Sequence, residues 1–278
     1  MNTFSKKINK EEEKFIMKNY SNFELESNNQ YIKFFAKTNE ITISLYTSSK
    51  IVISGFRLEE NDLVKYLNNF EVNENIVGSD ETGTGDLFGP IIITAVKFNN
   101  KTSDVLKKIN VGDSKKISDN IIEDYYLKLI NNVESKTIII EPENYNEMYK
   151  RTGNIKSIIS WGHFKVQNMI GGDYKRIIDQ FVNKSKFFEY ISKDSNEYDD
   201  WLFETKSEDK YPQVAVASII ARHKLNEWFK INNEKNSFEL KKGNSYTRDE
   251  LKVLIKKIGK DNIKSYAKKD FKNIKNLV

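Results

Sequence analysis

The stretch IVGSDETGTGDLFGPIIITAV, residues 76–96, holds the pattern that decides the fold. Ile76 to Gly78 predicts a short strand that runs into the acid pair Asp80-Glu81 and then into a glycine turn. After Pro90, the continuous apolar run of residues 91–96 is typical of a strand that is buried on both faces. Acids at the end of a buried strand, beside a turn of small residues, predict a functional site at that edge of a sheet.

The glycine turn does not match the common phosphate-binding motifs. Gly85 is followed by a glycine four residues on rather than three, and no helix opens there, which excludes a dinucleotide fingerprint. No Gly-Lys-Ser/Thr follows, so the turn is not a P-loop either. What remains is an acid pair and a turn whose backbone can approach a ligand closely, and on its own this is also the pattern of a solvated turn.

Strands and helices alternate on the carboxyl side of this stretch. The sequence predicts strands near residues 137–140 and 174–178, the second ending at Asp179. Helical spacing covers residues 119–130, part of 155–170, and 214–229. Alternation of this kind predicts an α/β domain, which we place at residues 73–278.

The amino-terminal part has a different pattern. Residues 31–36, 41–46 and 51–54 predict three short antiparallel strands, and residues 59–70 predict a helix. A further helix is indicated within residues 1–25, and residues 71–75 form a polar linker. We therefore expect a small α+β domain at residues 1–72.

Composition narrows the classes of protein to consider. The 278 residues contain no cysteine, which excludes disulfides, thiolate metal sites and cysteine nucleophiles. Only two histidines are present, so histidine-centred catalysis is not expected. No apolar run approaches a membrane span, and the start does not resemble a secretory signal, so we expect a cytoplasmic protein. The net charge is +5, but residues 241–278 hold 12 basic against 4 acidic residues, a tail that either attracts phosphate or is merely solvated.

Two more segments matter because of their order along the chain. GDSKKIS, residues 112–118, is by itself a loop that leads to a helix cap. ETKSE, residues 204–208, leads into VAVASIIAR, residues 214–222, which is by itself an amphipathic helix with small residues. Together with the glycine turn, in this order, they resemble the motifs of the type 2 ribonucleases H. Thr84 stands where the HII enzymes usually carry arginine, and Asp179-Gln180-Phe181 is similar to the HIII form, so the resemblance is to the ribonuclease HIII branch.

The resemblance implies a ribonuclease H-like mixed sheet with flanking helices, and a site made of carboxylates. By this resemblance Asp80, Glu81, Asp179 and Glu208 are the catalytic residues and metal ligands. Hard oxygen ligands suit Mg²⁺ or Mn²⁺, with two ions expected in each active site. Neighbours on an ideal strand face opposite sides, so Asp80 and Glu81 can reach one site only if the strand twists or ends at Asp80.

The same resemblance implies substrate contacts. Gly83, Thr84 and Gly85 would contact the ribonucleotide through their backbone amides, since the 2′-hydroxyl distinguishes RNA from DNA. Ser114 and Lys115 are expected at backbone phosphates. The amino-terminal unit is similar to the TATA-binding-protein-like domain of this branch, with Lys50 expected at the nucleic acid; the alternative is that its aromatic residues are ordinary core.

The expected function is therefore that of an endoribonuclease that cleaves the RNA strand of RNA/DNA hybrids by two-metal hydrolysis, leaving 5′-phosphate and 3′-hydroxyl ends. We expect a monomer whose partner is the hybrid. Two alternatives stay open: nicking at single ribonucleotides embedded in DNA, as HII enzymes do, and hybrid binding without catalysis. Four filled acid positions argue against the second alternative, because a binding module gains nothing from repelling carboxylates near phosphate.

Overall fold

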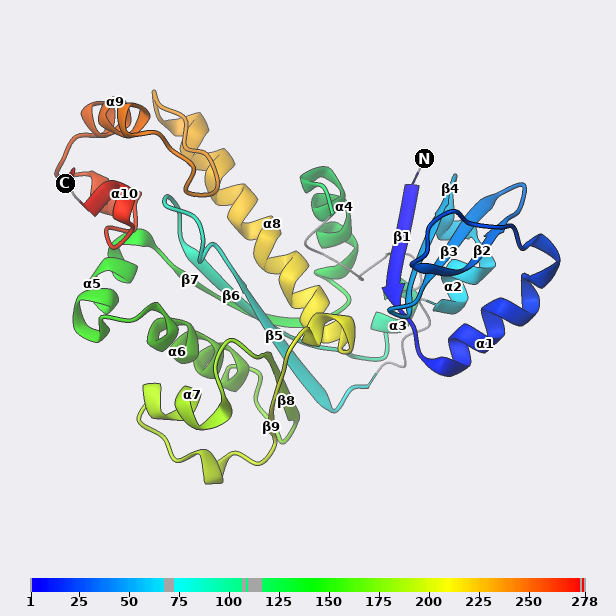
Figure 1. Cartoon of the computed structure of the whole chain (residues 1–278). Helices are drawn as coiled ribbons and strands as arrows, with labels where there is room; N and C mark the ends of the chain where they lie inside the picture. Colours follow the sequence, from blue (N-terminus) through cyan, green and yellow to red (C-terminus); the bar gives the residue numbers. More distant parts are fainter. Residues whose placement is uncertain (1, 68–72, 107–108, 110–116, 276, 278) are drawn as a thin grey trace.

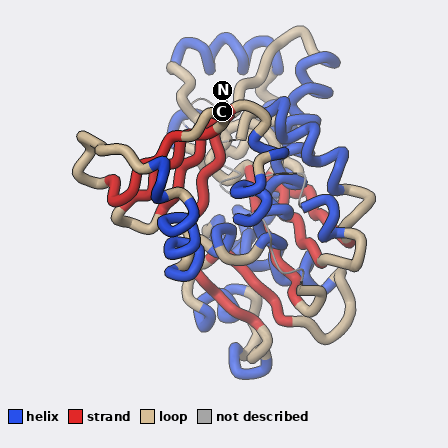
Figure 2. The backbone as a smooth tube through the Cα atoms, turned by 90° about the vertical axis from the view of Figure 1, so that its right-hand side faces the viewer, coloured by secondary structure: helices blue, strands red, loops and turns tan. Residues whose placement is uncertain are grey.

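The structure is a computed structural model that describes residues 2–67, 73–106, 109, 117–275 and 277. The chain forms two separate sheets, one of four strands and one of five (Figure 2). No helix within the described ranges is both long enough and apolar enough to cross a membrane.

The first sheet is antiparallel, with strand order β1-β4-β3-β2. Its strands are β1 (Asn2–Lys7), β2 (Ile32–Lys37), β3 (Ile41–Tyr46) and β4 (Lys50–Gly55). Side chains alternate in β3, where Ile41, Ile43 and Leu45 are buried and the residues between them are half-exposed. The apolar face packs on α1 (Lys10–Asn19) and α2 (Asp62–Leu67) as a core of its own. Short 3₁₀ turns lie at Ser21–Phe23 and Leu58–Glu60. The three strands expected from the sequence are confirmed, and β1 is an additional edge strand.

The second sheet is mixed, with strand order β7-β6-β5-β8-β9. Its strands are β5 (Ile76–Thr82), β6 (Ile91–Lys97), β7 (Glu134–Ile140), β8 (Lys175–Asp179) and β9 (Trp201–Glu204). Strands β5, β6 and β7 run antiparallel, whereas β8 and β9 run parallel to β5. The strand β5 does not end at Gly78, as the sequence suggested, but continues through both acids to Thr82.

Helices cover both faces of the second sheet (Figure 1). The long helix α8 (Pro212–Lys235) crosses one face against β5 and β6, with α4 (Asp119–Leu129) packed on it. The opposite face carries α6 (Ile155–Asn168), flanked by α5 (Pro142–Thr152) and α7 (Lys184–Tyr190). Short helices lie at α3 (Thr102–Leu106) and, as 3₁₀ turns, at Ser195–Glu197 and Ser207–Asp209, the latter labelled η5.

Glycines let both layers approach the sheet closely. A Cβ on Gly78 would lie 2.7 Å from the backbone nitrogen of Val214 in α8, and a Cβ on Gly162 in α6 would lie 2.1 Å from Ile93 Cδ1. Real Cβ atoms do not come that close, so a larger side chain at Gly78 would push α8 away from β5, and one at Gly162 would force the Ile93 side chain to move. The site at the end of β5 therefore rests on two rigidly packed layers.

The carboxyl-terminal lobe, residues 240–275, closes the structure. It contains α9 (Arg248–Ile258), a 3₁₀ turn at Ile263–Ser265 and α10 (Lys272–Lys275). Its apolar side chains share one core cluster with Leu87 and Phe88 from the turn between β5 and β6. The lobe lies beside that turn at one end of the sheet (Figure 1).

Candidate active site

Two of the expected acids lie side by side at the carboxyl ends of parallel strands. Ser79 in β5 is in register with Ile178 in β8, so the next residues along each strand, Asp80 and Asp179, are neighbours. Asp80 is 8% exposed and Asp179 is half-buried. The backbone amide of Ser207 donates a hydrogen bond of 3.1 Å to Asp179 Oδ1. This amide fixes the Asp179 carboxylate and ties η5, which carries Glu208, to the end of β8.

Asp80 and Glu81 point to opposite faces of the sheet. Gly78 faces α8, as its contact with Val214 shows, and Asp80, two residues further on, shares that face. Glu81 faces α6, where its Oε2 lies 3.0 Å from His163 Nε2. One condition under which both acids were expected to reach one site, a strand that ends at Asp80, is not met, because β5 continues to Thr82.

A chain of hydrogen bonds through residues of α6 and β5 holds the Glu81 side chain. Gln167 Nε2 donates to Ser79 Oγ at 2.8 Å and to the carbonyl oxygen of Ile177 at 2.9 Å. Ser79 Oγ lies 2.8 Å from His163 Nδ1. The Ser79 hydroxyl accepts from the Gln167 amide. Because the Glu81 carboxylate can only accept, His163 Nε2 carries a hydrogen, and in the neutral imidazole Nδ1 then accepts from the Ser79 hydroxyl. Nε2 donates to Glu81, so the chain Gln167, Ser79, His163 orients the carboxylate.

The fourth expected acid, Glu208, lies on η5 between β9 and α8 and is half-buried. It adjoins Ser207, whose amide contacts Asp179. Within the described part of the chain, no group of three or more His, Cys, Asp or Glu side chains is arranged as a ready-made metal cage. The structure thus brings Asp80, Asp179 and the segment of Glu208 to one strand end, with Glu81 held on the other side of β5.

One further acid stands at this edge without having been expected. Glu204 in β9 is the register partner of Asp179. Its carboxylate binds the Lys210 ammonium and accepts a hydrogen bond of 2.8 Å from the Tyr211 hydroxyl. The hydrogen bond from Lys210 holds the pKa of Glu204 below its usual value, and burial together with Glu204 raises the pKa of Tyr211 to about 12. Glu204 is therefore committed to these two partners.

The expected substrate-binding glycines lie in the turn of residues 83–90, which joins β5 to β6 and is called the glycine turn below. Gly83 has φ +85° and is buried, and a Cβ there would lie 2.2 Å from the carbonyl oxygen of Pro90. Gly85 is exposed, with open space where a Cβ would be. Within the described residues, no partner accepts a hydrogen bond from the backbone amides of Thr84 and Gly85. The tip of the turn, half-exposed at Thr84 and exposed at Gly85, therefore carries two amides with no acceptor among the described residues.

The other expected contacts are placed less completely. Ser114 and Lys115 lie outside the described residues. Lys50 begins β4 and stands opposite Lys7 of β1, on the face of the first sheet that is not covered by helices. Arg222 of α8 donates to the carbonyl oxygen of Ile117 at 3.0 Å, a contact that fastens the start of α4.

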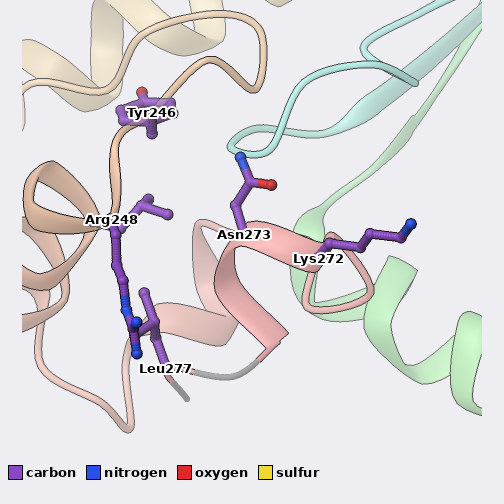
Figure 3. A pocket seen from close by; sticks show the side chains of 6 residues that line it. Tyr246, Arg248, Lys272, Asn273 and Leu277 are labelled. Atoms are coloured by element: carbon purple, nitrogen blue, oxygen red, sulfur yellow. The ribbon is translucent and has the colours of Figure 1, made fainter.

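A pocket of 430 Å³ lies apart from the acids, in the carboxyl-terminal lobe (Figure 3). The described residues that line it are Tyr246, Arg248, Leu251, Lys272, Asn273 and Leu277. None of the four candidate acids is among them. The chemistry that the acids predict therefore belongs to the strand end and the glycine turn rather than to this pocket.

A comparison with protein-family models decides the relationship. The model described as Ribonuclease HII matches residues 77–274, most of the chain and all of the strand-end acids. The chain belongs to the ribonuclease HII family. A second model, described as Domain of unknown function (DUF3378), matches residues 3–61. Among curated relatives, Ribonuclease HIII of Lactococcus lactis subsp. cremoris (strain SK11) is 33% identical over 269 residues, covering 91% of this chain and 90% of the relative.

Solved structures share the fold of this chain. Bst-RNase HIII in complex with Mn²⁺ superimposes with a TM-score of 0.67 at 22% identity, covering 99% of this chain and 97% of the other. Aquifex aeolicus RNase H3 gives a TM-score of 0.58 at 25% identity, covering 95% and 98%. These matches confirm the expected fold, a ribonuclease H-like mixed sheet preceded by a four-stranded antiparallel α+β unit. The chain is a ribonuclease of the HIII branch, as the motifs indicated.

Two contributions to this ribonuclease site were missed from the sequence. Ser79 and Glu81 alternate on one strand face, and His163 and Gln167 are four apart on one helix, so each pair shares a surface. Those spacings were a usable signal, but only the tertiary packing of α6 on β5 shows that the pairs meet. The second contribution is the buried Lys268, which contacts the glycine turn from the far end of the chain.

Proposed function

We propose that this ribonuclease cleaves the RNA strand of RNA/DNA hybrids, with Asp80, Glu81, Asp179 and Glu208 as metal ligands. Because Glu81 points to the face of β5 opposite to Asp80, this proposal requires the twist of β5 to bring both carboxylates to one metal site. The observation that carries the proposal is the register of β5 with β8, which sets Asp80 beside Asp179 and leaves both at the strand end next to η5. Carboxylates gathered at one edge repel one another and favour a bound cation. The products of such hydrolysis carry 5′-phosphate and 3′-hydroxyl ends.

The donor set fits a hard divalent cation. All four candidate side chains offer carboxylate oxygens, which suit Mg²⁺ and Mn²⁺, and the solved relative named above contains Mn²⁺. We expect two ions. When bound, such ions neutralise charge on the phosphate and lower the pKa of a water molecule. The chain's own part is to aim the ligands: Ser207 fixes Asp179, and His163 fixes Glu81.

In this proposal the glycine turn distinguishes ribose from deoxyribose. The amides of Thr84 and Gly85, which have no acceptor among the described residues, would meet the ribonucleotide, with buried Gly83 allowing the turn its left-handed conformation. Hydrogen bonds to a 2′-hydroxyl distinguish RNA from DNA at one position. Ser114 and Lys115 remain expected phosphate contacts by their place in the motif.

The amino-terminal unit, for which we propose residues 1–72 as the domain, would hold the hybrid with the uncovered face of its sheet. This face carries a cross-strand row of Ser5, Val52, Ser44 and Phe35. The lysines Lys7 and Lys50 lie opposite each other on the same face. Hydroxyls and ammonium groups on one surface suit sugar and phosphate contacts. Phe34, in contrast, is 2% exposed and belongs to the core, as the alternative interpretation of the aromatics held.

A substrate panel tests this function. Labelled RNA/DNA hybrid, and duplex DNA with a single ribonucleotide, are incubated with the protein in Mg²⁺, Mn²⁺ or EDTA. We expect metal-dependent cleavage of the hybrid and little nicking at the single ribonucleotide, because Thr84 replaces the usual HII arginine. Efficient nicking at the lone ribonucleotide would move the proposal to the HII activity. Tight hybrid binding without cleavage in either metal would refute catalysis.

A further inference from the structure

The glycine turn is built jointly with the carboxyl-terminal lobe. The amide of Leu87 donates to the carbonyl oxygen of Gly243 at 3.0 Å, and the amide of Gly89 donates to that of Tyr266 at 2.9 Å. The amide of Lys268 in turn donates to the carbonyl oxygen of Leu87 at 2.9 Å. Phe88 pairs with Ala267 as an isolated β-bridge. The base of the turn is therefore fixed by residues more than 150 positions later in the chain.

The buried ammonium group of Lys268 adds to these contacts between the lobe and the glycine turn. The side chain of Lys268 is fully buried, and its ammonium donates to the carbonyl oxygens of Asp86 at 2.7 Å and Gly89 at 2.5 Å. Burial lowers its pKa to about 8, while the carboxylates of Asp86 and Asp270 act in the opposite direction. A buried ammonium costs stability, which an apolar side chain of the same size would not. Both acceptors are backbone carbonyl oxygens of the glycine turn, one in its middle at Asp86 and one near its end at Gly89.

The part of the glycine turn that the lobe does not hold can face a ligand. Asp86 is held from its side chain as well, since its Oδ1 accepts a hydrogen bond from the amide of Gly243. The side chain of Asn273 in α10 (Figure 3) donates to the carbonyl oxygen of Asn244 at 2.7 Å, next to Gly243, which contacts the turn. At the tip, the amides of Thr84 and Gly85 have no acceptor among the described residues, and there is open space beside Gly85. The lobe thus braces one side of the turn and leaves the other side exposed.

We propose that Lys268 is a positioning residue for ribose recognition: its buried ammonium holds the carbonyl groups of Asp86 and Gly89 so that the amides of Thr84 and Gly85 are presented in one fixed geometry. This inference rests on the proposed role of the glycine turn. Without the brace, the turn samples more conformations, and binding must pay the entropy of ordering it. The loss falls on the ribose contact and not on the general attraction between the basic lobe and phosphate.

The test compares Lys268→Met with Lys269→Met in the full chain. Lys269 is the exposed neighbour, so both variants remove one positive charge from the same segment. Affinities for RNA/DNA hybrid and for duplex DNA are measured in EDTA, where cleavage cannot interfere. We expect Lys268→Met to weaken hybrid binding about tenfold and DNA binding less than about twofold. Lys269→Met should change both affinities by the same small factor.

Two outcomes would overturn the inference. One is a folded Lys268→Met protein that binds hybrid as the wild type does. The other is a loss that is equal for hybrid and DNA, which would assign Lys268 to general electrostatics. Lys268→Ala, compared with Lys269→Ala, repeats the test with a smaller side chain that has no N–H donor; if the Met variant does not fold, unchanged hybrid selectivity in Lys268→Ala overturns the inference. Cleavage by the wild type is scored separately, so failure of the proposed function is seen independently.

Discussion

At the scale of single residues, the site depends on how each carboxylate is held. Asp179 accepts from the amide of Ser207, and Glu81 accepts from His163 at the end of a hydrogen-bond chain that begins at Gln167. Partners behind metal-binding side chains orient the ligands and tune metal affinity. His163 is fully buried beneath the sheet, so its role is to position Glu81 rather than to meet substrate.

Replacing His163 should weaken the metal site. We expect His163→Ala to raise the Mn²⁺ concentration for half-maximal cleavage about tenfold or more, in line with the usual cost of losing such a partner. His163→Gln keeps an N–H donor within reach of Glu81 and should restore most of the affinity. A metal titration of cleavage checks this. His223→Ala is the control, because His223 stacks on Tyr126 at 3.7 Å and has no place in the chain of hydrogen bonds; equal effects of the two alanine variants would contradict the assignment.

At the scale of elements, the glycine turn contains one glycine, Gly83, that the fold requires and another, Gly85, that we propose substrate binding requires. Gly83 has a left-handed conformation and touches the carbonyl of Pro90, so a side chain there strains the backbone. Gly85 has open space at its Cβ position, so a side chain there meets solvent in the free protein and, under the proposed role of the turn, would meet substrate in the complex. The two glycines of this motif are thus constrained differently, Gly83 by its backbone conformation and Gly85 by the proposed substrate contact.

Valine at these positions should give different phenotypes. We expect Gly85→Val to melt within a few degrees of the wild type while losing at least about tenfold in kcat/KM on hybrid. Gly83→Val should lower the melting temperature clearly, since the added atoms collide with backbone. Thermal unfolding and steady-state cleavage measure both effects. If Gly85→Val cleaved hybrid at the wild-type rate, the turn would have no part in recognition.

The elements that the sequence predicted are those with strong periodicity or long apolar runs. Strands β3 and β6 and helix α8 fall close to their expected positions, because alternation or continuous apolar residues mark their burial. β1 was missed because its only buried side chain is Phe4, and β9 because it has four residues. The strand β5 appeared short because its acids looked like a loop, yet both are part of the β5–β6 ladder.

Part of the candidate site was also predictable, because some of its residues are marked by local sequence patterns. Asp80 and Asp179 could be placed at strand ends from local pattern, and motif order made Glu208 a candidate. Strand geometry warned that Asp80 and Glu81 would face opposite sides, but the glycines after them were expected to let both reach one site, and instead β5 continues to Thr82. Contacts made by tertiary packing, such as His163 with Glu81 or Lys268 with Gly89, join residues 82 and 179 positions apart. No local pattern in the sequence specifies such pairs.

At the scale of the whole molecule, the two sheets have separate cores. The cluster beneath the first sheet contains buried residues from Phe4 to Leu67 only, and the clusters around the second sheet begin at Ile76. Units that bury their own cores can keep their folds apart from each other. The carboxyl-terminal lobe differs, since it shares a cluster with the glycine turn and is part of the catalytic unit.

Removing residues 1–72 should therefore impair binding more than chemistry. We expect KM for RNA/DNA hybrid to rise about tenfold or more, while kcat under saturating substrate stays within a few-fold of the full chain. The physical reason is that the uncovered sheet face, with Lys7 and Lys50, adds contacts to the hybrid but none to the acids. Steady-state cleavage by the two chains decides it, and an unchanged KM would refute the role of this unit.

The measurement that bears most directly on the account compares Asp179→Asn with Glu204→Gln in single-turnover cleavage of labelled hybrid in Mn²⁺. The two acids are register partners on adjacent strands, and each variant removes one negative charge from the same edge. Because Asp179 is a proposed metal ligand while Glu204 is bound to Lys210 and Tyr211, we expect a loss of at least about a thousandfold for Asp179→Asn and less than about fivefold for Glu204→Gln. Comparable rates in the two variants, or full activity of Asp179→Asn, would contradict the carboxylate site at the end of β5 and β8.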